Sequence, residues 1–510
     1  MSRLDNVKKN ITASYIAQFI TMILGFVCRT IFIKNLGEIY LGINGLFANV
    51  IGLLSLAEMG FGTALNYEMY APVAQKDYPK IKVLLSIYRR TYHLIAAFIL
   101  VVGFLLIPFL HIIIDFPENV GNIYIYYIIY LLISITSYFS TYLFCLTNAE
   151  QKEYISTYSV LLTSLCTNIL QIVSLLIFSS FIMYISISLA MTIMQQVLIL
   201  IYFRKNYRHV FESDDIRLDI PTKVNIKKNV GGLLVGKFAD VLVNQTDNIM
   251  IAMGLNLSIV GIADNYVIII SMLKSFVMAL MKSAIPSLGN MAALEDKRYC
   301  YSIFKIYDLF DFIIYGTITV GLAANFQEFI TIWAGKNKMI ETSAMYMLVA
   351  TFYIAGRAHA FNNLKTAFGI FYDAKITCIM RAVLNIVISV FGVKFWGLKG
   401  VYLGTIISLI YVNIRIPRLA YNKITGEQFD LYLINRLIQA GMIFLITVFV
   451  VWVNRLVEIG NLYISFIMHT ITSVIITVLF IFLTYGKREE FDSLYQIIMN
   501  TLFRQKKNNR

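Results

Sequence analysis

The sequence has few charged residues and few prolines. Of its 510 residues, only 14% are charged and 58% are hydrophobic, whereas a soluble protein carries charge at about a quarter of its positions. The seven prolines leave room for long uninterrupted helices. The five cysteines make neither a disulfide framework nor a metal-binding spacing. The composition therefore excludes a soluble multidomain protein, a disulfide-rich secreted protein and a cysteine-bound metal protein.

Motifs of enzymes and of ATP-driven pumps are also missing. The sequence contains no GxxxxGK[ST], HExxH or CxxC motif. Its longest predicted loop, residues 204–229, is too short for a folded domain. We therefore expect a non-enzymatic protein without a metal or organic cofactor, which takes any energy from a source other than its own ATP hydrolysis.

The sequence does contain a series of apolar runs of 20 or more residues, each long enough to cross a hydrocarbon core of about 30 Å. These runs predict an all-α integral membrane protein of about fourteen transmembrane helices. The helices are expected at residues 11–34, 41–66, 92–114, 121–147, 156–179, 181–203, 230–252, 259–281, 303–325, 341–363, 375–394, 399–419, 435–454 and 461–485.

Lys and Arg are distributed unevenly between the loops. With the N-terminus inside, 32 of the 43 basic residues fall in cytoplasmic segments and only six in outside loops. Because basic residues concentrate on the cytoplasmic side, both termini are predicted to be cytoplasmic. The net charge of +14 is then explained by attraction to anionic membrane lipids, and no nucleic-acid partner is expected.

A weak internal repeat predicts the architecture. A shift of 219 residues aligns Lys8-Lys9-Asn10 with Lys227-Lys228-Asn229, and Gly42-Ile43 with Gly261-Ile262. Each repeat therefore holds six helices, and the two repeats insert with the same orientation. We expect an N-terminal lobe, a cytoplasmic linker, a C-terminal lobe around a shared central cavity, two extra helices and a basic cytoplasmic tail. Their predicted bounds are 1–203, 204–229, 230–420, 421–485 and 486–510.

The first helix of each repeat carries a polar stripe at helical spacing. In matching order the stripes are Asn10, Ser14, Gln18, Thr21, Gly25 and Arg29 in the first repeat, and Asn229, Leu233, Lys237, Asp240, Asn244 and Asn248 in the second. We expect both stripes to line a wet cavity. A structural ion pair between Lys237 and Asp240, at i and i+3, is the alternative for those two residues.

Nine charged residues lie within the predicted helices, and facing lipid they would cost roughly 20–30 kcal/mol in total. They are Arg29, Lys237, Lys274, Arg357, Arg381, Glu58, Asp240, Asp247 and Asp264. Five bases against four acids favour an anionic cargo. Arg29 has no acid at i±3 or i±4, which favours a binding role over a structural ion pair.

Several stretches resemble Wzx-type polysaccharide repeat-unit flippases of the multidrug/oligosaccharidyl-lipid/polysaccharide exporter (MOP) superfamily, especially Gram-positive capsule and exopolysaccharide members. They include Gln245-Thr246-Asp247-Asn248-Ile249-Met250-Ile251, Leu56-Ala57-Glu58-Met59-Gly60, Asn362-Asn363-Leu364-Lys365 and Gly400-Val401-Tyr402-Leu403-Gly404. Arg381 departs from the pattern, because it stands where many relatives carry an acid. This departure argues against borrowing an ion site from that helix.

The resemblance implies alternating access and a cargo of undecaprenyl-diphosphate-linked oligosaccharide, flipped to the outer face of the bacterial plasma membrane. Polysaccharide polymerase and glycosyltransferases of the same pathway are the implied protein partners. Candidate diphosphate contacts are Arg29, Lys237, Lys274 and Arg357, since guanidinium and ammonium groups pair with phosphate. Candidates for binding a coupling cation, H⁺ or Na⁺, are Asp240 and Asp247. Gln18, Asn244 and Asn248 are expected to line the cavity.

Two other functions are compatible with parts of the sequence. An ion-coupled multidrug extruder would share the fold, but its cavity should be dominated by acids. A membrane polysaccharide polymerase or glycosyltransferase should have a sizeable outside loop with catalytic residues, whereas the outside loops here are short and their acids are scattered.

Overall fold

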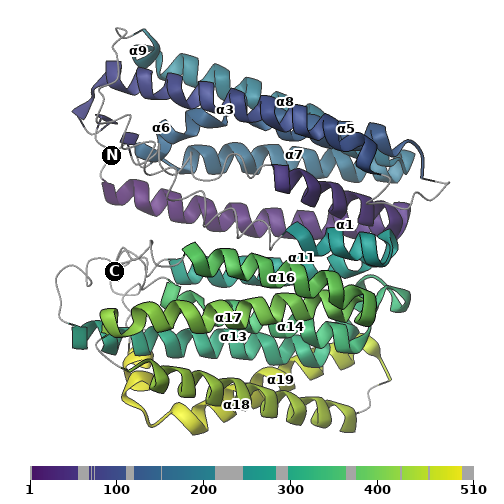
Figure 1. The fold of residues 1–510 in the computed structure, drawn as a ribbon, viewed down its shortest axis with the longest axis vertical. Helices are drawn as coiled ribbons and strands as arrows, with labels where there is room; N and C mark the ends of the chain where they lie inside the picture. The colour runs from purple at the N-terminus through teal and green to yellow at the C-terminus, as the bar shows by residue number, and fades with distance from the viewer. Residues whose placement is uncertain are drawn as a thin grey trace, which may run out of the picture. The chain divides into compact units, whose positions relative to one another are not determined.

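The structure is a computed structural model that describes residues 3–54, 68–69, 72–73, 75–110, 120–150, 152–212, 245–282, 297–362, 375–425, 428–457 and 460–496, without the side chains of 3–18, 279–282, 297–300, 375, 420 and 422–425. Regular structure in these ranges is entirely helical (Figure 1). Eleven of the described helices are long and apolar enough to span a membrane. The predicted all-α, multi-pass membrane fold is confirmed.

The chain forms two compact units, residues 1–264 and 265–510. The first contains α1 (Arg3–Leu54), α3 (Tyr78–Leu106), α5 (Ile123–Ser137), α6 (Phe144–Ala149), α7 (Tyr154–Phe178), α8 (Phe181–Asn206), α9 (Arg208–Phe211) and the start of α11 (Leu257–Lys282). Local sequence explains several helix ends. Asn122 caps α5 through its side chain, and Ser179 in the left-handed region (φ 48°) ends α7 just before α8 begins.

The 52-residue α1 is two helices joined at Gly37. Gly37 has φ 81° and ψ −176°, a conformation that side-chain-bearing residues rarely adopt. As one straight helix, α1 would measure about 78 Å, more than twice the hydrocarbon thickness. The chain instead turns back at this glycine (Figure 1), which agrees with the separate helices predicted at 11–34 and 41–66.

The second unit contains the rest of α11, α13 (Lys297–Trp333), α14 (Thr342–Arg357), α16 (Lys375–Trp396), α17 (Leu398–Thr425), α18 (Phe429–Leu456) and α19 (Leu462–Tyr485). The α16–α17 hairpin is tight because glycines let the backbones meet. A Cβ on Gly400 would lie 2.0 Å from the Gly392 carbonyl oxygen, and one on Gly404 would lie 2.3 Å from Ser389 Oγ. Neither position tolerates a side chain in this packing.

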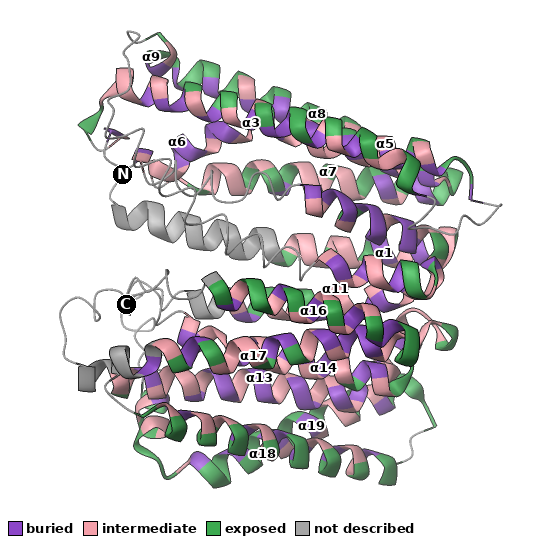
Figure 2. Cartoon of the chain, viewed as in Figure 1, coloured by how far each residue is buried: buried purple, intermediate pink, exposed green. Residues whose placement is uncertain are grey.

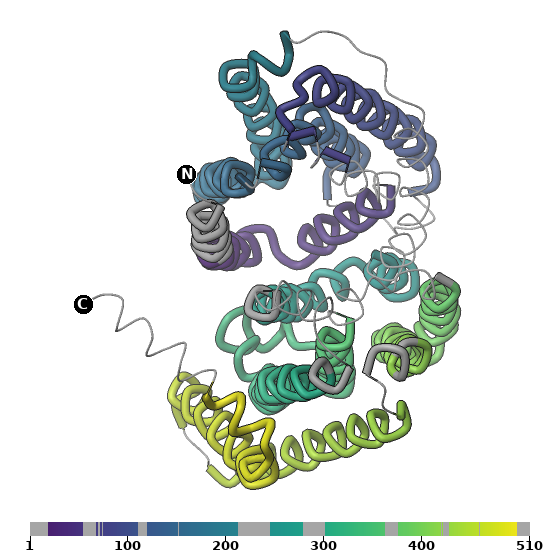
Figure 3. Tube along the Cα trace, turned by 90° about the vertical axis from the view of Figure 1, so that its left-hand side faces the viewer, coloured from purple at the N-terminus to yellow at the C-terminus, as the bar shows by residue number. Residues whose placement is uncertain are grey.

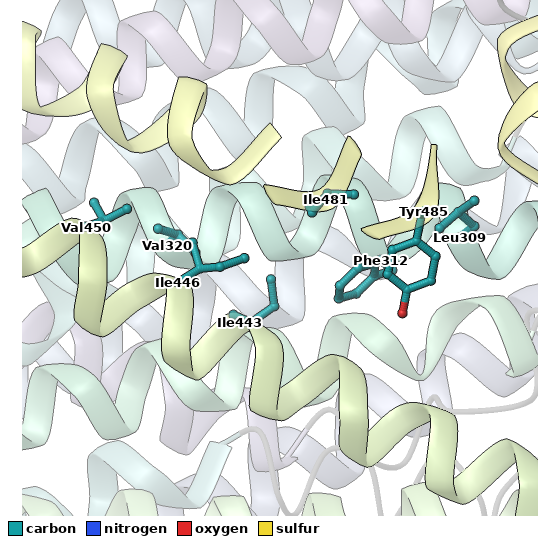
Figure 4. Close-up of a cluster of buried hydrophobic side chains, with 8 residues drawn as sticks. All are labelled: Leu309, Phe312, Val320, Ile443, Ile446, Val450, Ile481 and Tyr485. Carbon is teal, nitrogen blue, oxygen red and sulfur yellow. The ribbon is translucent and has the colours of Figure 1, made fainter. Parts of the chain in front are cut away.

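The two predicted extra helices, α18 and α19, pack on α13 at one edge of the second unit (Figure 3). Buried apolar side chains from the three helices form a single cluster (Figure 4). Its members are Leu309, Phe312, Val320, Ile443, Ile446, Val450, Ile481 and Tyr485. Beyond this cluster, many large apolar side chains of both helices stay exposed (Figure 2), as lipid-facing surfaces require.

Helix bounds differ from the predicted ones mainly where charged turns extend an apolar run. The helix predicted at 92–114 begins at Tyr78, and the one predicted at 303–325 covers Lys297–Trp333. Hydropathy detects only the lipid-embedded part of such helices. Most of the helix predicted at 230–252 lies outside the described residues, and α14 is only 16 residues long. The count of fourteen, the lobe boundaries and the cytoplasmic termini therefore stay predictions.

Candidate functional site

The second half of α1 and the segment 245–264 meet through two glycines, Gly42 and Gly261. A Cβ on Gly42 would lie 1.9 Å from the Leu257 carbonyl oxygen, and a Cβ on Gly261 would lie 2.2 Å from the Glu38 carbonyl oxygen. Both distances are below any real carbon–oxygen contact. Only glycine at both positions allows these two backbones to touch.

This contact is reciprocal with respect to the sequence repeat. The shift of 219 residues equates Gly42 with Gly261 and Glu38 with Leu257. Each glycine therefore touches the carbonyl of the residue that stands four positions before its own counterpart. Such an exchange of contacts is the mark of a local two-fold axis between equivalent elements. The weak repeat in the sequence thus has a direct structural counterpart.

An ion pair lies beside the glycine contact. Arg29 on α1 donates from Nη2 to Asp264 Oδ2 of α11 at 2.9 Å, and the side chains are only 8% and 18% exposed. The repeat equates Arg29 with Asn248 and Asp264 with Gly45. A Cβ on Gly45 would lie 3.5 Å from Asn248 Nδ2. The repeat therefore equates two contacts between the same two elements. One holds the Arg29–Asp264 pair, and the other holds Asn248 beside Gly45.

The sequence argument that Arg29 has no acidic partner is wrong. It considered acids within one helical turn, but the partner lies 235 positions away along the chain. Asp264 offsets the charge of Arg29, which makes a buried guanidinium tolerable at membrane depth. Asp264 is 18% exposed, so an anion that reaches the pair can take its place on Arg29 through charge-assisted hydrogen bonds.

The other predicted site residues are divided between the two units. Asn248 is buried, Asp247 is half-buried, and both lie in the segment that meets α1. Lys274 is half-buried on the part of α11 that belongs to the second unit. Lys237, Asp240 and Asn244 lie outside the described residues, as does the side chain of Gln18. Their predicted roles stay predictions.

Arg357 lies at the end of α14 in a sealed polar network. Its Nη1 donates to Asp311 Oδ2 at 2.7 Å, and its Nη2 donates to Asp308 Oδ2 at 3.1 Å and to Gln439 Oε1 at 2.7 Å. Arg436 also donates to Asp308. The side chains of Arg357 and Asp311 are 5% and 0% exposed. This network joins α14, α13 and α18 and gives Arg357 a structural role.

Sequence reasoning missed the partners of Arg357, although a signal was present. Asp308 and Asp311 are spaced i and i+3 within an apolar run, and Arg436 and Gln439 are spaced the same way near the start of another. Each pair therefore lies on one face of its helix. These two aspartates and Arg436 lie within predicted helices but were not among the nine charges of the prediction. The cationic excess of the cavity stays a prediction.

Comparison with solved structures defines the class of protein. A lipid II flippase, MurJ, in an inward closed conformation matches 92% of this chain and 98% of its own, with a TM-score of 0.68 and 14% identity. A multidrug resistance transporter of the MATE family in the MOP superfamily matches 84% and 99%, with a TM-score of 0.65 and 13% identity. A MOP superfamily transporter from Pyrococcus furiosus matches 82% and 96%, with a TM-score of 0.53 and 13% identity. The chain has the fold of MOP transporters.

Sequence comparison gives the family. A family model described as "Polysaccharide biosynthesis protein" matches residues 7–292, more than half of the chain, and the chain belongs to that family. No curated protein matches the sequence significantly. The resemblance to polysaccharide flippases of the MOP superfamily is thereby confirmed, and the Gram-positive capsule type stays a prediction.

Proposed function

We propose that this protein flips undecaprenyl-diphosphate-linked oligosaccharide repeat units from the cytoplasmic to the outer face of a bacterial plasma membrane, for capsular or exopolysaccharide biosynthesis. Its membership of a polysaccharide biosynthesis family supports the cargo class, and its MOP fold supports transport by alternating access. Polymerase and glycosyltransferases of the same pathway are the proposed neighbours in function.

The observation that carries the proposal is the Arg29–Asp264 pair beside the reciprocal glycine contact. A diphosphate is the part of the cargo that hydrocarbon excludes most strongly, because its charge is concentrated. The planar fork of Arg29 can hold two phosphate oxygens at once. We propose that the diphosphate exchanges with Asp264 for Arg29, so that the arginine stays neutralised before, during and after binding.

The same exchange offers a link between binding and helix movement. Asp264 and Gly261 are one turn apart on α11, and Gly261 touches the backbone of α1. Releasing Asp264 from Arg29 removes a bond between the helices that the glycine contact joins. Loss of that bond favours separation of the two helices, and alternating access requires helices from the two repeats to separate.

The test is removal and replacement of Arg29. Arg29→Ala should abolish surface polysaccharide while membrane protein levels stay normal, and Arg29→Lys should restore only part of it, because an ammonium cannot bind a diphosphate bidentately. Both are measured by quantitative surface polysaccharide assay and by immunoblot of the membrane fraction. Arg208→Ala, in an exposed pair with Glu212, is the matched control and should export normally. Full export by Arg29→Ala contradicts the proposal.

Energy coupling is the second element of the proposal. Asp247 lies half-buried in the segment that meets α1, where a carboxylate can bind H⁺ or Na⁺, and Asp240 remains the alternative. Asp247→Asn should keep protein levels and lose the dependence of transport on the ion gradient. Gradient-driven transport that survives both Asp247→Asn and Asp240→Asn would leave these acids with a structural role. Lys237 and Lys274 stay proposed diphosphate contacts along the path.

An ion-coupled multidrug extruder is the second candidate, because a MATE transporter shares the fold. Expression in a drug-sensitive host separates the two functions. An extruder raises the tolerated concentration of organic cations without any polysaccharide locus, whereas a flippase leaves it unchanged and restores polysaccharide to a strain that lacks its own flippase.

A further inference from the structure

A cavity lies between α14, α17 and α18 of the second unit, whereas the Arg29–Asp264 pair belongs to the first unit. Its volume is about 260 Å³, and most of its wall is apolar, with Phe361, Ile416 and Leu437 among the lining residues. Two arginines, Arg357 and Arg436, also reach the wall. An apolar cavity with a cationic group on its wall suits an amphipathic anion, whose charged group and apolar chain each find a matching surface.

The arginines present unused hydrogen-bond donors. Within the described part of the chain, Nε and Nη1 of Arg436 and Nε of Arg357 are buried without an acceptor. Arg436 directs its Nη2 to Asp308, and its guanidinium lies 4.9 Å above the Tyr432 ring. These three donors have almost no accessible surface, so the contact that the cavity offers is with the accessible part of Arg436, whose side chain is 14% exposed.

The charge that faces the cavity is positive although the network as a whole is neutral. The lining includes both arginines but neither Asp308 nor Asp311. The aspartates therefore neutralise the guanidinium groups from the other side, and Arg436, whose side chain is 14% exposed, supplies the cationic surface of the wall. An anionic oxygen in the cavity would accept from Arg436 without meeting a carboxylate on the wall.

The depth of the site matches a lipid headgroup. Arg436 is seven residues after the start of the 28-residue α18, which places it roughly 10 Å from that end at 1.5 Å per residue. Arg415 and Arg418, exposed on α17, lie at the corresponding end of the neighbouring helix. Basic groups at this level attract anionic headgroups.

A second apolar cavity of about 810 Å³ continues the first along α14 and α18. The two share Tyr353, Ile354 and Ala440 in their walls, and the second extends to Trp452. Together they make an apolar path that starts at the two arginines and runs toward the other end of α18. Acyl chains fill such a path, whereas a free phosphate ion has no use for it.

We infer that this cavity is a binding site for an anionic phospholipid, with the phosphate on Arg436 and an acyl chain along the groove between α14 and α18. The site is separate from the cargo path proposed above and does not depend on it. Binding would join α13, α14 and α18 through one ligand, since Arg436 on α18 bonds Asp308 on α13 and the acyl chain lies against α14.

The test uses the full-length protein, delipidated in detergent and titrated with dioleoylphosphatidylglycerol or dioleoylphosphatidylcholine, with bound lipid counted by native mass spectrometry. Wild type should retain one phosphatidylglycerol in preference to phosphatidylcholine. Arg436→Gln should weaken that retention about tenfold, because the cationic contact with the phosphate is lost. Equal retention by wild type and Arg436→Gln, or equal retention of both lipids, overturns the inference.

A second pair of variants leaves all the charges in place. Ala440→Phe fills the shared wall of the two cavities, whereas Gly441→Phe adds the same ring at the next position, where a Cβ meets nothing within 4 Å. Ala440→Phe should lose the lipid and Gly441→Phe should keep it, even if Arg436→Gln fails to fold. Loss in both variants, or in neither, contradicts the site.

Two competing ligands identify the source of the phosphate. Inorganic phosphate at millimolar concentration should not displace phosphatidylglycerol, and undecaprenyl diphosphate should displace it no better than an equal amount of phosphatidylcholine does. Displacement by inorganic phosphate would mark an ion site without a lipid. Selective displacement by undecaprenyl diphosphate would assign the cavity to the cargo path and overturn the inference, whereas the Arg29 variants test that path independently.

Discussion

Arg29 and Arg357 are intramembrane arginines with carboxylate partners, and their surroundings differ. Arg357 in the second unit bonds Asp311, whose side chain is 0% exposed, and two further polar residues from α13 and α18. Arg29 in the first unit bonds Asp264, whose side chain is 18% exposed, on a helix whose backbone meets α1 at two glycines. Asp308 beside Arg357 is 16% exposed, so the exposure of one carboxylate does not distinguish the two sites. The fully buried Asp311 does, because a partner that no cargo can reach holds Arg357 in place.

The largest expected effect comes from breaking the sealed network. Arg357→Ala leaves Asp311 buried without its main partner, which typically costs about 3–5 kcal/mol. We expect loss of the folded protein from the membrane fraction, measured by immunoblot and by the thermal midpoint in detergent. Arg29→Ala should retain normal levels in the same assays. A stable, exporting Arg357→Ala protein would show that the network is not structural, and the contrast between the arginines would disappear.

The next prediction sharpens the contrast by exchanging charges. The double variant Arg29→Asp, Asp264→Arg restores the ion pair with its ends reversed. Protein levels should recover relative to Arg29→Asp alone, because the buried charge is again paired. Surface polysaccharide should stay low, because the guanidinium no longer projects from α1. Complete recovery of export would mean that pairing alone matters at this place.

The sequence predicted the fold well because membrane burial leaves only a few solutions for the backbone. Apolar runs and the positions of Lys and Arg identify the membrane spans. Gly42 and Gly261 identified the repeat, and in the structure the backbones meet at these two glycines. Partners across the fold could not be predicted in this way. The pair of Arg29 with Asp264, and that of Arg357 with Asp311, depend on which helix faces meet. Local spacing cannot determine that, and long-range packing decided both.

A smaller effect is expected from the glycine contact. Gly42→Ala and Gly261→Ala each place a methyl group about 2 Å from a carbonyl oxygen, and overpacking of this kind costs about 1–3 kcal/mol. We expect normal protein levels with export reduced about tenfold, because the state in which α1 touches α11 is disfavoured. Gly321→Ala on α13 is the control, since a Cβ there meets nothing within 4 Å.

Additivity tests whether the glycine contact is one unit. Once either methyl group has separated the helices, the second should cost little more. The double variant should therefore export about as much as the worse single variant, by the same surface polysaccharide assay. Fully multiplicative losses would indicate two independent contacts, and wild-type export in all three variants would contradict a role for the contact in transport.

The smallest effect is expected at an exposed ion pair of the second unit. Lys305 on α13 donates to Glu490 Oε1 at 2.6 Å, and Phe491 packs against the cluster of α13, α18 and α19, so the beginning of the basic tail is docked. Burial is the largest single influence and acts to raise the pKa of Glu490, but the hydrogen bond and charge of Lys305, a backbone hydrogen bond and the charge of Arg488 together outweigh it and lower the pKa below the ordinary 4.5. A lowered pKa stabilises the docked segment above pH 4.5, and that stability is lost as the pH falls through the pKa of the folded protein.

The side chains of Lys305 and Glu490 are 41% and 21% exposed, so their pairing is worth about 1 kcal/mol or less. Glu490→Gln should remove this small dependence on pH and leave polysaccharide export unchanged. Hydrogen exchange of residues 489–496, measured at pH 7 and at pH 4, reports the docking directly. Protection should fall at pH 4 in wild type and be equally low at both values in Glu490→Gln. Equal protection of wild type at both pH values would show that Phe491 and its apolar neighbours dock the segment without the ion pair, in contrast to the charge-dependent network around Arg357.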